Sequence, residues 1–302
     1  MTKAPSDLQE VNGSRYFVLA FLCLSAAIAY VQRGAISVPA AEIAADLEFR
    51  NFATEMGWVQ SAWYLCYGLM QLPSGWLADR IGSRQTLAIL SVVWSLATLL
   101  SGLATDFVSL LVLWGLMGAA QAGAFPSAAK AIGQIFPETE RARATGLLAA
   151  GMSIGGAVAP VLTAGCMEWL TPFAVSLEID RWRLLLAAYA IPGILWTVAF
   201  MLLIFAKNLP LVESPRQAPA PINWLSMVTS ISLALLCAQQ FFRAAGMVFF
   251  MTWFPTFLQK TRDLSPLGSG VLTTVAGVGG VLGSLTGGFF SDWLLEWTGN
   301  AR

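Results

Sequence analysis

Three cationic side chains lie inside long apolar runs of this sequence: Arg33, Lys130 and Arg243. A charged group at membrane depth costs several kcal/mol unless it faces a polar cavity or can reach the surface. Arg33 lies about 25 Å into its run and Arg243 about 18 Å, at about 1.5 Å per helical residue. Lys130 lies near the end of its run, where its stem can reach water, and Arg33 can also snorkel outward.

No Asp or Glu lies in the middle of any apolar run. Fixed positive charge without a counter-charge favours an anion, because the anion supplies the missing partner. The forked guanidinium of arginine matches the two oxygens of a carboxylate. These residues therefore predict a cavity that binds a small organic anion.

The composition indicates a protein that crosses the membrane several times. Of 302 residues, 57% are hydrophobic and 11% are charged, whereas soluble domains carry about 25% charged residues. The net charge is zero, so nucleic acid is not expected as a partner. The chain has no His and only four isolated Cys, so we expect no metal, no cofactor and no enzymatic site.

Stretches of about 20 apolar residues are long enough to span a bilayer. Lys and Arg are in excess in the loops on the amino-terminal side, so we expect a cytoplasmic N-terminus in a cell membrane, with a bacterial inner membrane the best fit. The predicted spans are residues 16–40, 54–77, 84–104, 107–135, 144–166, 184–206, 231–258 and 268–290.

A Pro-rich polar stretch over residues 207–222 follows the sixth predicted span and is typical of a linker. Beyond it, the sequence Gly288–Asp292 repeats the pattern of Gly75–Asp79. Two repeated six-helix halves would need about twelve spans. We therefore expect a six-helix N-terminal bundle in residues 1–206 and the first two spans of an incomplete C-terminal bundle in residues 223–302. A complete eight-helix protein is the alternative.

The segment Gly75–Arg84 (GWLADRIGSR) lies between two apolar runs, and we expect a tight cytoplasmic loop there. It resembles the signature Gly-x-Leu-Ala-Asp-Arg-x-Gly of the major facilitator superfamily of transporters, which implies an all-α integral membrane fold. The resemblance further implies a conformational latch around Asp79, to which Arg141 or Arg143 could pair. The latch positions are Gly75, Asp79, Arg80, Gly82, Arg84, Arg141 and Arg143.

Further motifs resemble the anion:cation symporters of that superfamily, which carry sugar acids and other organic anions. They are Tyr30–Val38 (YVQRGAISV), Met56–Gly75, Ala124–Pro126 with Phe136–Gly146, and Phe250–Leu258. The resemblance implies a secondary transporter that works by alternating access. It also implies that substrate is bound by Tyr30, Arg33, Tyr67, Lys130 and Arg243. Core or interfacial packing is the alternative for the two tyrosines.

Two departures from the family pattern bear on energy coupling. Gln32 and Gln121 stand where proton-coupled members carry Asp and Glu, and Trp114 replaces an arginine. Glutamine keeps the hydrogen-bonding shape of a carboxylate but cannot take up a proton. We therefore expect no proton coupling by the usual route, although helices beyond the eighth span could supply another coupling group.

Two other functions remain open at this point. A cation or drug antiporter of the same superfamily would normally need a buried carboxylate, and the predicted spans contain none. A transporter-derived sensor would need a soluble output domain. We expect a monomer in the lipid bilayer, with the small anion as its partner.

Overall fold

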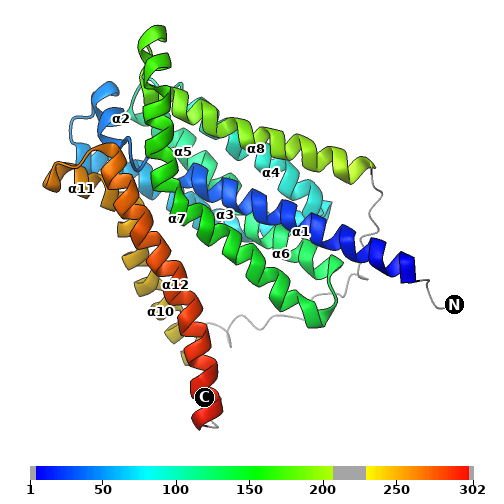
Figure 1. The fold of residues 1–302 in the computed structure, drawn as a ribbon. Helices are drawn as coiled ribbons and strands as arrows, with labels where there is room; N and C mark the ends of the chain where they lie inside the picture. The colour runs from blue at the N-terminus through cyan, green and yellow to red at the C-terminus, as the bar shows by residue number, and fades with distance from the viewer. Residues whose placement is uncertain (1–4, 207–228, 299–302) are drawn as a thin grey trace.

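The computed structural model describes residues 5–206 and 229–298, and every regular element in these ranges is helical (Figure 1). Seven helical stretches are long and apolar enough to cross a membrane. Many large apolar side chains on their surfaces are exposed, as lipid-facing residues would be. The elements are α1 (Pro5–Gly34), α2 (Ala40–Asp46), α3 (Phe52–Ile81), α4 (Ser83–Ser101), α5 (Phe107–Gln121), α6 (Ala124–Ile135), α7 (Glu138–Leu177), α8 (Arg181–Ala206), α10 (Ile231–Val248), η1 (Phe249–Trp253), α11 (Phe254–Arg262) and α12 (Pro266–Thr298).

The all-helical membrane fold predicted from the sequence is confirmed. The predicted span 54–77 lies in α3, which has the length of a span but is not among the seven stretches that are both long and apolar enough to cross a membrane. Residues 207–222 lie outside the described residues, so the linker and the domain limits drawn from it stay predictions. The side of the membrane on which the N-terminus lies also stays a prediction.

The segment Gly75–Arg84 is not the ten-residue loop predicted from the sequence. Helix α3 continues to Ile81 and α4 begins at Ser83, so Gly82 alone separates them. Gly82 has φ +94°, which L residues with side chains rarely adopt, and this explains the glycine there. Gly75 lies within α3, and a Cβ added there would meet nothing within 4 Å. Gly75 therefore makes no close approach to a neighbouring backbone.

The predicted span 107–135 is divided into α5 and α6. Pro126 has no backbone N–H, so the carbonyl of Ala122 loses its usual helical donor at this point. Gly123 sits at the break, and a Cβ added there would lie 2.9 Å from the Cβ of Ser74. The break thus coincides with close packing of this segment against α3.

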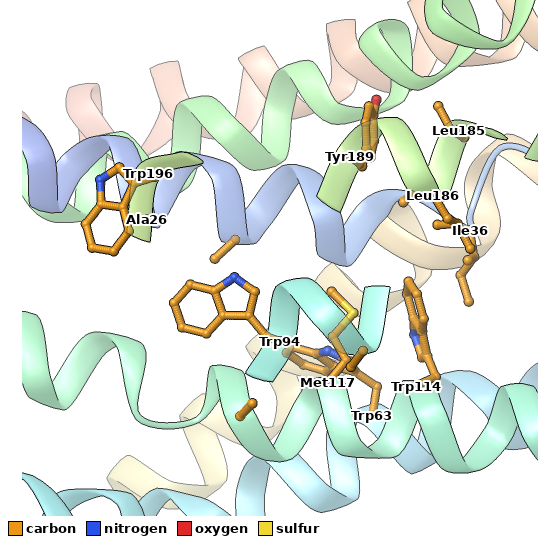
Figure 2. Close-up of a cluster of buried hydrophobic side chains, with 14 of the residues drawn as sticks. Ala26, Ile36, Trp63, Trp94, Trp114, Met117, Leu185, Leu186, Tyr189 and Trp196 are labelled. Atoms are coloured by element: carbon orange, nitrogen blue, oxygen red, sulfur yellow. The ribbon is translucent and has the colours of Figure 1, made fainter. Parts of the chain in front are cut away.

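The N-terminal bundle, which we define as residues 5–206, is built from helix pairs that lie side by side. Helix α1 packs along α7, α3 along α5, and α4 along α8. Glycine allows such close approaches: a Cβ on Gly155 of α7 would lie 2.5 Å from the carbonyl oxygen of Ala27 on α1. Figure 2 shows Trp94, Trp114 and Met117 filling the space between the helices.

Ion pairs hold α2 against the start of α8. Arg183 Nη2 lies 2.7 Å from Asp46 Oδ2, and the indole N–H of Trp182 donates to the same oxygen at 3.0 Å. Arg181 forms a second ion pair with Glu42. These contacts fix the end of the bundle at which α1 stops, next to the functional site described below.

The C-terminal segment, which we define as residues 229–298, contains α10, η1, α11 and α12. It joins the bundle chiefly through α12, which packs along α7 (Figure 1). Near α2, Thr256 Oγ1 donates to the carbonyl of Ser37 at 3.3 Å. Gln259 Nε2 donates to the carbonyl of Val38 at 3.1 Å. The two parts are therefore closed on each other at this end of the molecule.

Candidate anion-binding site

Arg33 lies inside a cage of aromatic rings. Its guanidinium carbon is 4.0 Å from the ring centroid of Trp63 and 4.9 Å from that of Tyr64. Tyr30 and Tyr67 complete the cage at 5.4 and 5.9 Å. The negative faces of aromatic rings stabilise a cation at these distances. Arg33 is therefore held inside the protein by aromatic rings, with no carboxylate of the described ranges paired to it, and it does not snorkel to the surface.

A cavity of about 230 Å³ opens beside Arg33 between the N-terminal bundle and the C-terminal segment. Arg243 of α10 lines it from the opposite part of the molecule. Among the described residues, neither arginine forms an ion pair, and Arg243 donates from Nε to Gln240 Oε1 at 2.7 Å. The polar and aromatic lining residues are Tyr30, Arg33, Ser37, Gln60, Trp63, Tyr64, Arg243 and Thr252.

Sequence reasoning missed several of these lining residues. Gln60, Trp63 and Tyr64 recur with Tyr67 at helical spacing on α3, so they share one face. That stripe could have been found in the sequence as a polar-aromatic face on a membrane helix. Thr252 gave no such signal, because its position depends on the π-helical turn η1 that interrupts the helix after α10.

Lys130 lies away from the cavity, although it was expected among the substrate-binding residues. Its Nζ lies 2.6 Å from Asp79 Oδ1 and donates to the carbonyl of Ala78 at 2.8 Å. Lys130 therefore contacts Asp79, one of the predicted latch positions. Tyr67 contacts Arg33 and stacks on Trp63 at 4.8 Å, so it supports the site from behind the cavity wall.

The predicted latch positions on α3 lie toward its C-terminal end, whereas Gln60, Trp63 and Tyr64 line the cavity from its N-terminal half. Arg80 stacks over the ring of Trp76 at 4.3 Å. Arg141 donates from Nε to the carbonyl of Phe136, and its Nη1 lies 3.7 Å from Glu138 Oε1. Asp79 thus forms an ion pair with Lys130, whereas the contacts of Arg141 described here are to Phe136 and Glu138.

Gln32 and Gln121 both act as hydrogen-bond donors inside the N-terminal bundle. Gln32 Nε2 donates to the carbonyl of Tyr189 at 2.7 Å, and Gln121 Nε2 donates to that of Ala29 at 3.1 Å. The two side chains are 1% and 4% exposed, so water does not compete for these bonds. An ionised carboxylate can only accept hydrogen bonds, whereas a protonated one can donate. Each glutamine therefore makes a donor contact that an ionised carboxylate in its place could not make.

No group of His, Cys, Asp or Glu in the part of the chain that the structure describes could hold a metal ion. The four cysteines are all free thiols. Trp114, which replaces an arginine of the family pattern, is fully buried in the core and does not line the cavity. The charge available to a solute in the cavity is thus that of Arg33 and Arg243.

Apolar helices in two packed parts, with a cationic cavity between them, define this chain as a polytopic membrane protein of transporter architecture. The family model of the Major Facilitator Superfamily matches residues 22–301. The chain therefore belongs to the major facilitator superfamily, as its sequence predicted.

Its relatives include transporters of sugar acids, of the anion:cation symporter type. The D-galactonate transporter of Escherichia coli O6:H1 is 30% identical over 97% of this chain and 70% of its own length. The hexuronate transporter of Bacillus subtilis is 31% identical over 93% of this chain and 65% of its own length. The chain thus spans about two thirds of the length of these relatives.

Solved structures confirm the fold. A bacterial homologue of the human lysosomal transporter Spinster, crystallised in an inward-facing and occupied conformation, matches with a TM-score of 0.74. The identity is 22%, and the match covers 92% of this chain and 61% of that one. A D-xylose–proton symporter matches with a TM-score of 0.66 at 13% identity, covering 92% of this chain and 69% of that one. At these identities the likeness concerns the fold alone.

Proposed function

We propose that this protein is a secondary transporter that moves a small organic anion, a sugar acid or a similar carboxylate, across the membrane by alternating access. One observation carries the proposal: Arg33 and Arg243 line the same cavity from two parts of the molecule, and none of the described residues that line it with them is acidic. An anion entering there gains charge-assisted hydrogen bonds from either side. The sugar-acid relatives support the same substrate class.

The cavity suits a small solute. Its volume of about 230 Å³ equals roughly eight water molecules at about 30 Å³ each. The aromatic rings of Tyr30, Trp63 and Tyr64 offer apolar faces, while Ser37, Gln60 and Thr252 offer neutral hydrogen-bonding groups. This mixture fits a compact molecule with one strongly charged end and a polar body.

We infer further that transport does not use a proton carried at the positions of Gln32 and Gln121. Both amides donate to backbone carbonyls, as a protonated acid would, and neither can release a proton. The anion gradient and the membrane potential are then the driving forces. A single charge crossing 100 mV exchanges about 2.3 kcal/mol with the field, which corresponds to roughly a fiftyfold concentration ratio.

Counterflow in proteoliposomes tests the substrate class. Vesicles loaded with D-galactonate should take up labelled D-galactonate, and D-glucarate should compete, whereas the lipophilic cation tetraphenylphosphonium should not. Arg33→Gln and Arg243→Gln should each abolish counterflow. Arg50→Gln is the matched control, because Arg50 is an exposed arginine outside the cavity.

Transport of tetraphenylphosphonium with no effect of D-galactonate would favour the cation or drug antiporter instead. A cation would meet two arginines there and no carboxylate from the part of the chain that the structure describes, so the cavity does not favour that alternative. Tight binding of D-galactonate without any counterflow would favour a sensor derived from a transporter.

A further inference from the structure

Tyr64 and Thr252 face each other across the junction between the N-terminal bundle and the C-terminal segment. Tyr64 lies on α3, Thr252 lies on η1, and both line the cavity. Their hydroxyl oxygens are 3.4 Å apart, whereas a well-formed bond between two hydroxyls spans roughly 2.7–2.8 Å. The two groups are therefore neighbours that satisfy each other poorly.

The position of this pair relative to Arg33 suggests what it contacts. The ring of Tyr64 lies 4.9 Å from the guanidinium carbon of Arg33, so a carboxylate bound by Arg33 brings its adjacent carbon atoms close to the tyrosine. Thr252 is 6% exposed, so bulk water has little access to its hydroxyl. Each hydroxyl offers one donor and two acceptor sites, and neither carries charge. A neutral hydroxyl on the solute is the group that matches both.

The backbone of η1 presents Thr252 at this place. Five residues, Phe249–Trp253, form a π-helical turn between α10 and α11. Such turns are rare and are found frequently at functional sites, because the wider turn changes which side chains share a face. Here Val248, Met251 and Thr252 all line the cavity. A π-helical turn at this wall of the cavity therefore positions one polar group among apolar ones.

We propose that Tyr64 and Thr252 form a hydroxyl-reading pair that selects polyhydroxylated carboxylates over plain carboxylates of the same length. The inference rests on the proposed function, since it concerns the same cavity. A solute hydroxyl between the two donates to one and accepts from the other, which replaces their long mutual contact and links the two parts of the molecule. An acid without that hydroxyl leaves the buried hydroxyl of Thr252 and the half-buried hydroxyl of Tyr64 poorly paired, and sites of this kind discriminate between solutes with and without the matching group.

The test compares D-galactonate with hexanoate, which has the same number of carbon atoms and no hydroxyls. Binding of both acids to the full chain in detergent is measured by calorimetry. Tyr64→Phe and Thr252→Val should each weaken D-galactonate binding about two- to twelvefold, the range for one neutral hydrogen bond. Hexanoate binding should change by less than about twofold by the same reasoning. The double variant should lose less than the product of the two single losses, because both residues contact one hydroxyl.

Matched controls remove hydroxyls that lie outside the cavity. Tyr16→Phe and Thr286→Val alter exposed side chains and should leave the preference for D-galactonate unchanged. Thr252→Ser keeps the hydroxyl and should keep the preference, which separates the hydroxyl from the packing of the methyl group. A thermal unfolding midpoint for each variant shows that the fold is intact.

If the variants lost affinity equally for both acids, or lost none for D-galactonate, the proposal that Tyr64 and Thr252 select hydroxylated acids would be overturned. If Arg33→Gln abolishes binding of D-galactonate but Tyr64→Phe leaves the preference for D-galactonate over hexanoate unchanged, this inference fails and the proposed function stands. If wild-type protein binds neither acid and Arg33→Gln changes nothing, both fail together.

Discussion

Replacing Arg33 by lysine separates the effect of its charge from the effect of its shape. Lysine keeps the positive charge but presents a single ammonium in place of the planar fork. In the structure the guanidinium carbon lies over two rings of its cage, 4.0 Å from the centroid of Trp63 and 4.9 Å from that of Tyr64. The N–H groups of the guanidinium are the donors that a carboxylate in the cavity would meet.

The magnitude follows from the number of hydrogen bonds. A bidentate carboxylate receives two charge-assisted bonds from arginine and one from lysine, and each such bond contributes about 1.5–3 kcal/mol. Arg33→Lys should therefore raise the Kd for D-galactonate roughly 12- to 150-fold. Arg33→Gln, which removes the charge as well, should abolish measurable binding.

Isothermal titration of purified protein with D-galactonate is the assay, with Arg50→Lys as the matched control. The exposed Arg50 lies outside the cavity, so its replacement should leave the Kd unchanged. If Arg33→Lys bound D-galactonate as tightly as wild type, the bidentate geometry would be refuted. If Arg33→Gln also bound normally, Arg33 would not contact the anion at all.

Three further predictions concern stability. Asp79→Asn should lower the free energy of unfolding by less than about 1 kcal/mol, because the pair with Lys130 is partly exposed; chemical denaturation checks this, and a larger loss would mean that the pair is part of the core. The pKa of Asp180 is raised above its ordinary value, first by desolvation and then by neighbouring carboxylates, so its ionisation destabilises the fold as the pH rises through that pKa. Asp180→Asn should therefore raise the melting temperature at pH 7 but not at pH 3, and the reverse order would contradict the assignment. Gly155→Leu should lower the melting temperature strongly, because a Cβ there meets the backbone of α1, whereas Gly165→Leu, with open space around it, should not; equal effects would refute the close-packing argument.

The charged parts of the site were predictable from the sequence. Arg33 and Arg243 stood out because a cation in an apolar run has few stable environments, and both line the cavity. Gln32 and Gln121 stood out only by comparison with a family pattern. Their donor role became visible with the backbone carbonyls that they contact.

Other features depend on packing between distant segments and were not predictable in this way. Lys130 pairs with Asp79, 51 residues away in the chain, and only the contact between α3 and α6 brings them together. Helix α3 runs through Gly75 to Ile81, because the neighbouring apolar turns outweigh the weak helix propensity of one glycine. Trp63 and Tyr64 resemble core residues in the sequence, and only the structure shows them around Arg33.

We propose that Arg33 and Arg243 bind an anion during its transport across the membrane and that no proton crosses with it. Uptake of labelled D-galactonate into proteoliposomes, under an imposed potential with equal pH on both sides, tests it most directly. An inside-positive potential should drive accumulation that Arg33→Gln abolishes, and a pH gradient at zero potential should drive none. Accumulation driven by the pH gradient alone, with no response to the potential, would contradict transport of the anion without a proton.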